Sequence, residues 1–233
     1  MSKYRQAFPM DKALIVVIHV KDIKQAVENA NIAFGEGADG VFLISHNRDL
    51  WLLYMSYLNV SNEHRGKWVG LNLLSGAPLP QIIDFAEGRL IKGLWFESIG
   101  YEEENELPVK MVEEMRNYQI STGASNILIF GGVAFKYQSH VKDPAKAAAL
   151  VAPHVDVVTT SGDGTGIAAP VDKIKAMKEA IGEHPLAIAS GISPENIDLF
   201  KPYADCFIVA SAISSSFNQL DPKRVKMMVD SLK

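Results

Sequence analysis

The sequence has few of the features that mark secreted, membrane or nucleic-acid-binding proteins. Among 233 residues there is one cysteine, Cys206, so no intrachain disulfide is possible. No apolar run approaches the ~20 residues of a membrane-spanning helix, and residues 1–12 lack the apolar core of a signal peptide. The formal net charge of −4 provides no basic surface for nucleic acid, and no polybasic run indicates a membrane surface. We therefore expect a cytoplasmic protein that binds neither nucleic acid nor membrane.

What the sequence does contain is a regular alternation of short apolar runs and helical patterns. Most of the runs are continuously apolar, which is typical of parallel strands buried on both faces. The predicted strands are residues 13–20, 41–46, 67–74, 91–98, 126–135, 155–162, 185–192 and 206–213. Eight strand–helix units in a chain of this length predict an α/β fold, a single (β/α)8 TIM barrel that spans 1–233 as one domain. A five-strand doubly wound sheet is the alternative, but it leaves three units unexplained.

Helix boundaries and strand starts follow the same repeat. Asp143-Pro144 and Ser193-Pro194 combine a capping side chain with proline at the first helical position, and Pro170 precedes a helix that stops at Gly182. Polar turns that contain aspartate lead into three of these strands, at residues 37–41, 153–158 and 202–207, as expected of a repeated unit.

The turns after the last two predicted strands indicate a phosphate site. The first reads Ser190-Gly191-Ile192 and the second reads Ser211-Ala212. Small residues let the backbone approach an anion, and N–H groups at a helix start bind phosphate well. In barrels the loops after strands 7 and 8 are a frequent phosphate site. We expect Gly191→Leu to abolish binding of a phosphate ester and to leave the fold intact.

Three residues at the carboxyl ends of strands are catalytic candidates, because barrel enzymes place their chemistry there. Lys136 follows the fifth strand and can supply a cation or a reactive amine. Glu97 follows an apolar stretch, which raises a carboxyl pKa and suits acid–base work. Asp163 lies in the glycine-rich loop 162–166. The alternatives are a solvated lysine, a salt bridge between Glu97 and Lys136, and a turn aspartate.

Further polar residues near the same strand ends are candidates for substrate binding. They are His19, His46, Asn72, Thr160 and Ser161. The alternative for each histidine is a satisfied core residue. His19, His46 and Glu97 also suffice in number for a metal site, but no metal-binding motif supports one, so we expect no metal and no cofactor.

Several of these segments resemble the BtpA (SgcQ-like) family of TIM-barrel proteins. The shared features are Lys136 after the fifth strand, the loop 161–166, the Ser-Gly-Ile-Ser-Pro-Glu-Asn turn from Ser190, and the small-residue turn at Ser211. The resemblance covers residues 126–213 well and 37–76 faintly. It implies a ribulose-phosphate-binding barrel with a phosphate site. The family has been named in photosystem I biogenesis and as phosphoribosyltransferase-like.

The chain also departs from the family pattern at three positions. Val20-Lys21-Asp22 stands where the family has a Pro/Gly-rich loop, His46-Asn47 replaces Glu-Asn, and Lys136-Tyr137 replaces Lys-His. These differences leave the phosphate site in place and make a different substrate or reaction the expectation.

Two functions remain open from the sequence. One is an enzyme that acts on a small phosphate ester, such as a sugar or ribosyl phosphate, by aldolase-, isomerase- or transferase-type chemistry. The other is a catalytically weak barrel that keeps the phosphate pocket and serves as a binding or assembly factor. The segment 50–58 is apolar on nearly every side if helical, with Trp51, Tyr54 and Leu58 the most prominent, and therefore predicts a homodimer.

Overall fold

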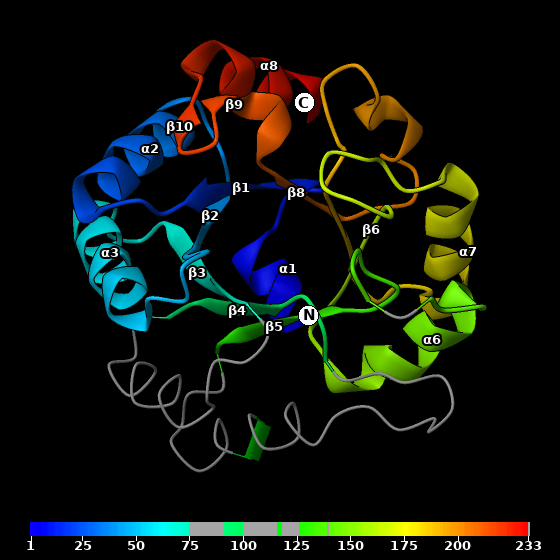
Figure 1. Ribbon diagram of the computed structural model, residues 1–233. Coiled ribbons are helices and arrows are strands. Elements are labelled where there is room, and N and C mark those ends of the chain that lie inside the picture. The colour runs from blue at the N-terminus through cyan, green and yellow to red at the C-terminus, as the bar shows by residue number, and fades with distance from the viewer. Residues whose placement is uncertain (75–90, 100–115, 118–125, 139, 233) are drawn as a thin grey trace.

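The computed structural model describes residues 1–74, 91–99, 116–117, 126–138 and 140–232. Eight strands pair in parallel and in sequence order, and the last pairs with the first to close a barrel (Figure 1). They are β1 (Ala13–His19), β2 (Gly40–Ile44), β3 (Trp68–Leu73), β4 (Gly93–Phe96), β5 (Leu128–Gly132), β6 (Val157–Ser161), β7 (Leu186–Ala189) and β8 (Cys206–Val209). The predicted (β/α)8 barrel is confirmed. Seven strands lie within the residues predicted for them, and β2 begins one residue earlier, at Gly40.

Helices surround the ring of strands (Figure 1). The helices are α1 (Lys3–Ala7), α2 (Ile23–Gly35), α3 (Leu50–Glu63), α6 (Pro144–Val151), α7 (Val171–Ile181) and α8 (Pro222–Leu232), with short 3-10 helices η1 (Ala152–His154), η2 (Ile197–Leu199) and η3 (Ser211–Ile213). A small antiparallel hairpin, β9 (Ser214–Ser216) with β10 (Gln219–Leu220), follows η3. Across the described residues, no helix is long and apolar enough to cross a membrane.

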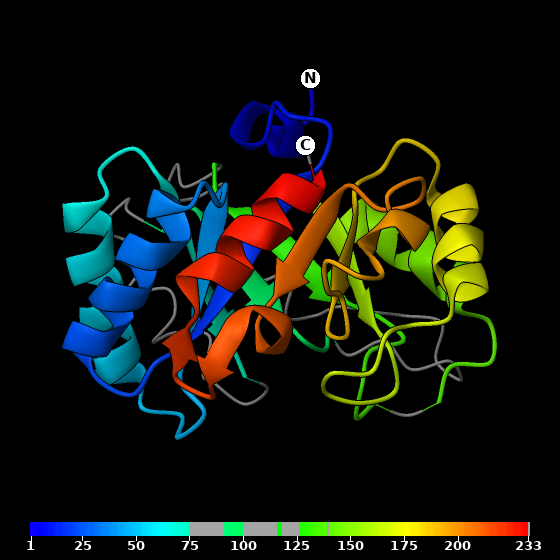
Figure 2. The ribbon, with the colours of Figure 1, turned by 90° about the horizontal axis from the view of Figure 1, so that it is seen from above.

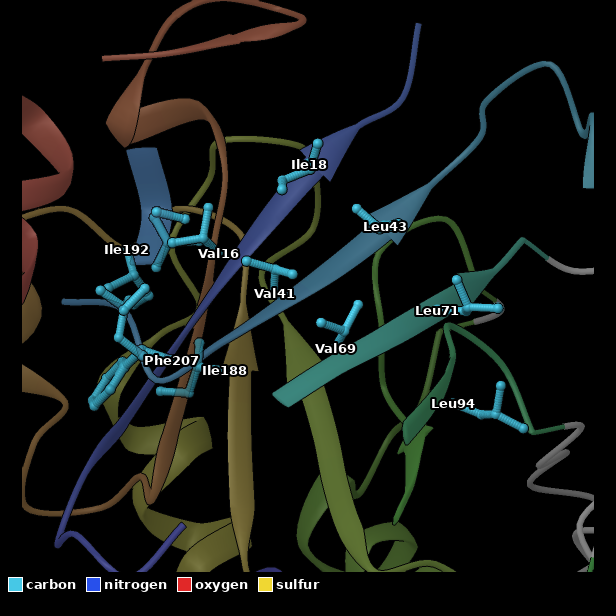
Figure 3. Close-up of a cluster of buried hydrophobic side chains, with 14 of the residues drawn as sticks. Val16, Ile18, Val41, Leu43, Val69, Leu71, Leu94, Ile188, Ile192 and Phe207 are labelled. Atoms are coloured by element: carbon cyan, nitrogen blue, oxygen red, sulfur yellow. The ribbon is translucent and has the colours of Figure 1, made fainter. Parts of the chain in front are cut away.

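The strands are apolar on both sides because each side packs against a separate core. Outward-facing residues such as Val16, Val41 and Leu71 lie side by side on neighbouring strands (Figure 3) and pack against the helices. Inward-facing residues such as Ile15 and Phe42 fill the barrel itself. This alternation decides which residues at the strand ends can reach the centre of the barrel.

The short helix α1 closes the amino-terminal end of the barrel. It lies in the middle of the ring in Figure 1 and beyond one end of the strands in Figure 2. Tyr4 and Phe8 are fully buried, and the Phe8 ring lies 5.1 Å from the Trp68 ring inside the barrel. Since this end is sealed, the inward-facing polar residues at the other end can form an open site.

Three aspartates at this closed end accept hydrogen bonds from the backbone near the starts of β1, β5 and β7. The Asp39 carboxylate accepts the N–H of Leu14 on β1 at 2.8 Å. Asp156 does the same for Ile129 on β5 at 2.9 Å, and Asp205 for Leu186 on β7 at 3.0 Å. These strand-start aspartates (Asp39, Asp156 and Asp205) explain the repeated polar turns in the sequence, because each holds its strand to the preceding one.

Helix α6 begins as predicted, with the Asp143 side chain accepting the N–H of Lys146 at 2.9 Å. The prediction of an α-helix starting at Ser193-Pro194 is wrong. Asn196 instead closes a tight turn, because its side chain accepts the N–H of Ser193 at 2.9 Å and donates to the Gly191 carbonyl at 2.8 Å. Only η2 follows. Strand β8 likewise ends before the predicted residue 213, because η3 begins at Ser211.

Candidate functional site

A cavity of about 440 Å³ lies at the carboxyl ends of the strands. Its apolar lining includes inward-facing side chains such as Val17, Ile44 and Trp95. The cavity brings together nine of the residues singled out in the sequence: Lys136, Glu97, His19, His46, Ser190, Gly191, Ile192, Ser211 and Ala212. A volume of this size suits a small metabolite.

The turn after β7 has the backbone of a ligand-binding loop. Ser190 and Gly191 both have positive φ angles, of 71° and 69°. A Cβ atom on Gly191 would lie 2.1 Å from the backbone nitrogen of Ala168, so the loop after β6 packs directly on this glycine. The expectation that Gly191→Leu leaves the fold intact is therefore wrong, because any side chain here meets backbone and adopts a strained φ.

The turn after β8 contributes the start of η3 to the same cavity. Ser211 and Ala212 line it, and the first residues of a helix have N–H groups without partners inside the helix. Ser211 is exposed and Ile213 is buried, so the turn is anchored on its far side. The two neighbouring strands thus present two turns of small residues to one cavity, as the sequence predicted.

Lys136 is positioned beside the β7 turn. Its ammonium donates to the hydroxyl of Ser190 at 3.1 Å and lies 3.5 Å from that of Thr165. Its backbone N–H donates to the Ser161 hydroxyl at 2.8 Å, which ties the lysine to the end of β6. The site therefore places a positive charge next to the turn, although neither turn contains a basic residue.

Glu97 lines the same cavity, immediately after β4, the strand next to β5. Its side chain is half-buried, and its backbone carbonyl accepts a hydrogen bond from the Gln138 side chain. Among the described residues there is no ion pair between Glu97 and Lys136, whose ammonium is bound to hydroxyls instead. The carboxylate and the ammonium are separate groups at one cavity.

His19 and His46 are bonded directly to each other at the ends of β1 and β2. The Nδ1 of His19 lies 2.7 Å from the Nε2 of His46. Burial, followed by the charges of His46 and Lys136, lowers the pKa of His19 to about 4. Burial and Lys136 also lower the pKa of His46, against the carboxylate of Glu97, which raises it. Both imidazoles are neutral at pH 7.

The remaining predicted residues do not line this cavity. Asn72 is 1% exposed and faces the barrel interior in register with Trp95, and neither its amide nitrogen nor its amide oxygen has a partner among the described residues. Thr160 is buried and donates to the Ala134 carbonyl at 3.1 Å. Ser161 is buried and holds the Lys136 backbone.

Asp163 is exposed and also lies outside the cavity lining. Burial lowers the pKa of Lys173, and the nearby Asp163 carboxylate raises it. The Lys173 ammonium donates to the carbonyls of Ala134 and Ser161, both at 2.6 Å. This lysine therefore joins the loops after β5 and β6, next to the predicted aspartate.

The structure adds cavity residues that the sequence analysis did not select. Trp95, Thr165 and Asn196 line the cavity. Trp95 precedes Glu97 by two residues and so shares its face of the strand, a signal that strand alternation provides. Thr165 belongs to the same glycine-rich loop as Asp163. Across the described residues, no three His, Cys, Asp or Glu side chains group closely enough to hold a metal ion.

Comparison with known proteins gives a family and a fold. A sequence model of the BtpA family matches residues 106–233, which is more than half of the chain. No curated protein sequence matches. The structure resembles phosphoribosyl anthranilate isomerase from Thermotoga maritima, with a TM-score of 0.69 at 15% identity over 95% of this chain and 98% of that one.

Two further structures are similar at the level of the fold. One is tryptophan synthase from M. tuberculosis, with a TM-score of 0.72 at 11% identity over 100% of both chains. The other is a phosphoribosyl anthranilate isomerase in complex with reduced 1-(o-carboxyphenylamino)-1-deoxyribulose 5-phosphate, with a TM-score of 0.64 at 14% identity over 95% of this chain and 98% of that one.

Proposed function

The chain belongs to the BtpA family, and from this premise we propose that it is an enzyme that binds a small phosphorylated metabolite, a sugar or ribosyl phosphate, in the cavity at the barrel mouth. The phosphate lies between Gly191-Ile192 and Ser211-Ala212. The observation that carries the proposal is the convergence of these two turns with Lys136 and Glu97 on one cavity of about 440 Å³.

The phosphate end of the ligand is assigned by the donors available there. Small residues in both turns allow main-chain N–H groups to approach an anion closely. The Lys136 ammonium is 3.1 Å from the Ser190 hydroxyl and so adds the positive charge that a dianion requires. The sequence predicted that main-chain N–H groups of the two turns bind the phosphate, with no lysine among its ligands. The position of Lys136 adds an ammonium group to these proposed ligands.

The other end of the ligand meets groups suited to proton transfer. Glu97 is a half-buried carboxylate without an ion-pair partner among the described residues, and the neutral His19–His46 pair lies at the same cavity. Acid–base groups opposite a phosphate clamp fit isomerase-, aldolase- or phosphoribosyltransferase-like chemistry. The similar isomerase that holds a 1-deoxyribulose 5-phosphate derivative supports a phosphorylated sugar as the ligand.

Two further properties belong to the proposal. The enzyme is a cytoplasmic homodimer, and α3 is part of the dimer interface. Trp51 on this helix is 67% exposed, and Tyr54 lies beside it with the ring centroids 6.4 Å apart. Trp51 is thus an exposed tryptophan that packs on a partly buried tyrosine, and a large exposed aromatic side chain is typical of an interface.

A thermal-shift screen with ribulose 5-phosphate, ribose 5-phosphate, 5-phosphoribosyl diphosphate and inorganic phosphate tests the proposal. A ligand at 100 times its Kd stabilises the fold by about 2.7 kcal/mol, or about 5 to 10 °C in Tm for a domain of this size. Lys136→Ala should weaken binding by about 10- to 100-fold, since a charge-assisted hydrogen bond contributes about 1.5–3 kcal/mol.

The matched control is Lys175→Ala, because Lys175 is exposed on α7 and is not part of the cavity. Equal affinities in wild type and Lys136→Ala would remove Lys136 from the site. A screen in which no phosphate ester stabilises the protein would contradict the proposed function itself. Binding without turnover of any bound compound would favour the alternative, a binding or assembly factor.

A further inference from the structure

The hydrogen bond between His19 and His46 fixes how protons are arranged on the two rings. At 2.7 Å between Nδ1 of His19 and Nε2 of His46, one nitrogen carries the hydrogen and the other accepts it. Each neutral imidazole has one N–H. The ring that donates the shared hydrogen therefore has a bare outer nitrogen, and the ring that accepts it carries a hydrogen on its outer nitrogen.

Only two neutral arrangements of the pair are possible. In the first, His19 donates from Nδ1, so its Nε2 is a free base and the Nδ1 of His46 carries a hydrogen. In the second, His46 donates from Nε2, so the Nε2 of His19 carries a hydrogen and the Nδ1 of His46 is free. Within the described chain neither outer nitrogen has a hydrogen-bond partner. Transfer across the shared bond therefore couples proton uptake at one outer nitrogen to release at the other.

The two rings differ in their access to water. His19 is half-buried and His46 is exposed, while both line the cavity. Burial and the charge of Lys136 oppose a positive charge on His19. Burial and Lys136 also lower the pKa of His46, but the Glu97 carboxylate, which raises it, partly offsets them. The local electrostatics therefore favour passing a proton from the inner ring to the outer one.

The pair is held in place from behind by the hairpin turn after η3. The Phe217 ring stacks on His19 at 4.4 Å, although Phe217 is 63% exposed. The side chains of Gln25 and Asn218 both donate to the His19 carbonyl, at 3.1 and 3.0 Å. Asn29, which is 1% exposed, donates to the Asn218 carbonyl at 2.8 Å. This support fixes the ring position, as proton transfer over a short bond requires.

We propose that His19 is a catalytic base of the barrel and that His46 relays its proton to water. This assignment rests on the proposed function, and it names the substrate as a ketose phosphate with a carbon–hydrogen bond next to its carbonyl. A neutral imidazole removes such a proton as a general base, while Lys136 stays at the phosphate end of the ligand.

In the proposed step the pair takes one hydrogen from the substrate and gives one hydrogen to water. The C–H bond breaks and its electron pair forms the C=C bond of an enediolate, while the carbonyl oxygen takes the negative charge. A new N–H bond forms at Nε2 of His19 as its Nδ1 hydrogen passes to Nε2 of His46. His46 then loses its Nδ1 hydrogen to water, which leaves the pair neutral in the second arrangement. Reprotonation from Nε2 of His19 runs the sequence backwards, and it delivers deuterium once the hydrogen on Nε2 has exchanged with D2O in the open cavity.

Deuterium exchange tests the relay without knowledge of the product. Ribulose 5-phosphate is incubated with the enzyme in D2O, and loss of the hydrogens next to the carbonyl is followed by NMR. We expect wild type to catalyse exchange, and His19→Gln to lose about 10²–10⁴-fold in exchange rate, the contribution of a general base, with ligand affinity reduced far less. We expect added imidazole to restore exchange to His46→Ala, because His46 is open to solvent, but not to His19→Ala.

The control variant is His154→Gln, on η1 at the other end of the barrel, which should exchange like wild type. Thermal shift with ribulose 5-phosphate is measured on every variant. Binding without exchange in wild type, or equal exchange in wild type and His19→Gln, would overturn the relay and leave the proposed function standing. If no phosphate ester binds at all, the proposed function fails and the relay fails with it.

A second readout does not depend on a substrate. In protein labelled with ¹⁵N-histidine, the shared hydrogen bond should give a scalar coupling between Nδ1 of His19 and Nε2 of His46. The two signals are assigned by their loss in His19→Gln and His46→Ala. Absence of this coupling in the folded wild-type protein would overturn the relay, whatever the exchange experiment gives.

Discussion

Acid should destabilise this barrel through His19 in particular. Burial, with His46 and Lys136, lowers its pKa to about 4 in the folded state, against about 6.5 in the unfolded chain. Between these two values the unfolded chain binds more protons than the folded one, so stability rises with pH in this window. The contribution of His19 is complete above pH 6.5 and is lost as the pH falls towards 4.

The size of the effect follows from the two pKa values. At pH 5 the unfolded imidazole is almost fully protonated, whereas the folded one is mostly neutral. The difference lowers the free energy of unfolding by about 2 kcal/mol relative to neutral pH. In His19→Gln this loss is absent, because glutamine does not titrate.

Urea unfolding of both proteins across this pH range measures the effect. The difference in free energy of unfolding between wild type and His19→Gln is referenced to pH 8, where the histidine is neutral in both states. We expect that difference to shift by about 2 kcal/mol in favour of the variant at pH 5. Parallel curves for the two proteins would refute the account of a buried, neutral His19.

Three further predictions follow from the structure. Asp205→Ala should lower the free energy of unfolding by about 3 kcal/mol in urea titration, because it leaves Lys178, 2.8 Å from this buried carboxylate, and the Leu186 N–H without their partner. Gly191→Ala should cost at least ~1–2 kcal/mol in the same assay, and a fully stable variant would disprove the close packing on Ala168. Trp51→Lys should convert the proposed dimer to a monomer by light scattering, with the monomer fold unchanged; a monomeric wild type would refute the interface.

Much of the fold was predictable because strands buried on both faces leave a continuous apolar signal. The run at 155–162 needed no other information to be recognised as a strand. The end of β8, at Val209 and not at residue 213, was less visible. So was the turn at Ser193, where Asn196 satisfies the backbone groups that a helix would have used. Side-chain competition of this kind depends on a contact three residues away, which apolar patterning does not report.

The candidate site was predictable in composition and less so in arrangement. Sequence placed His19 and His46 at neighbouring strand ends, but their direct bond depends on the register of β1 and β2, with His19 opposite Ile44. Thr160 was selected for its position near a strand end, whereas its side chain is turned to the Ala134 carbonyl. The sequence around Phe217 does not predict its contact with His19. That contact depends on the side chains of Gln25 and Asn29 on α2, which donate to the carbonyl of the next residue, Asn218.

The strand-start aspartates have a consequence for how the chain can be cut and rejoined. Each one joins two strands that are consecutive in sequence, β1 with β2, β5 with β6 and β7 with β8. Both chain ends lie at the closed end of the barrel (Figure 2), so a connector can join them at that end. A circular permutant opened between β6 and β7 keeps every one of these bonds within an unbroken stretch of chain. A permutant opened between β7 and β8 separates Leu186 from Asp205 by almost the whole sequence. New termini that separate β1 from β2, β5 from β6 or β7 from β8 should therefore be tolerated less well than termini placed between these pairs.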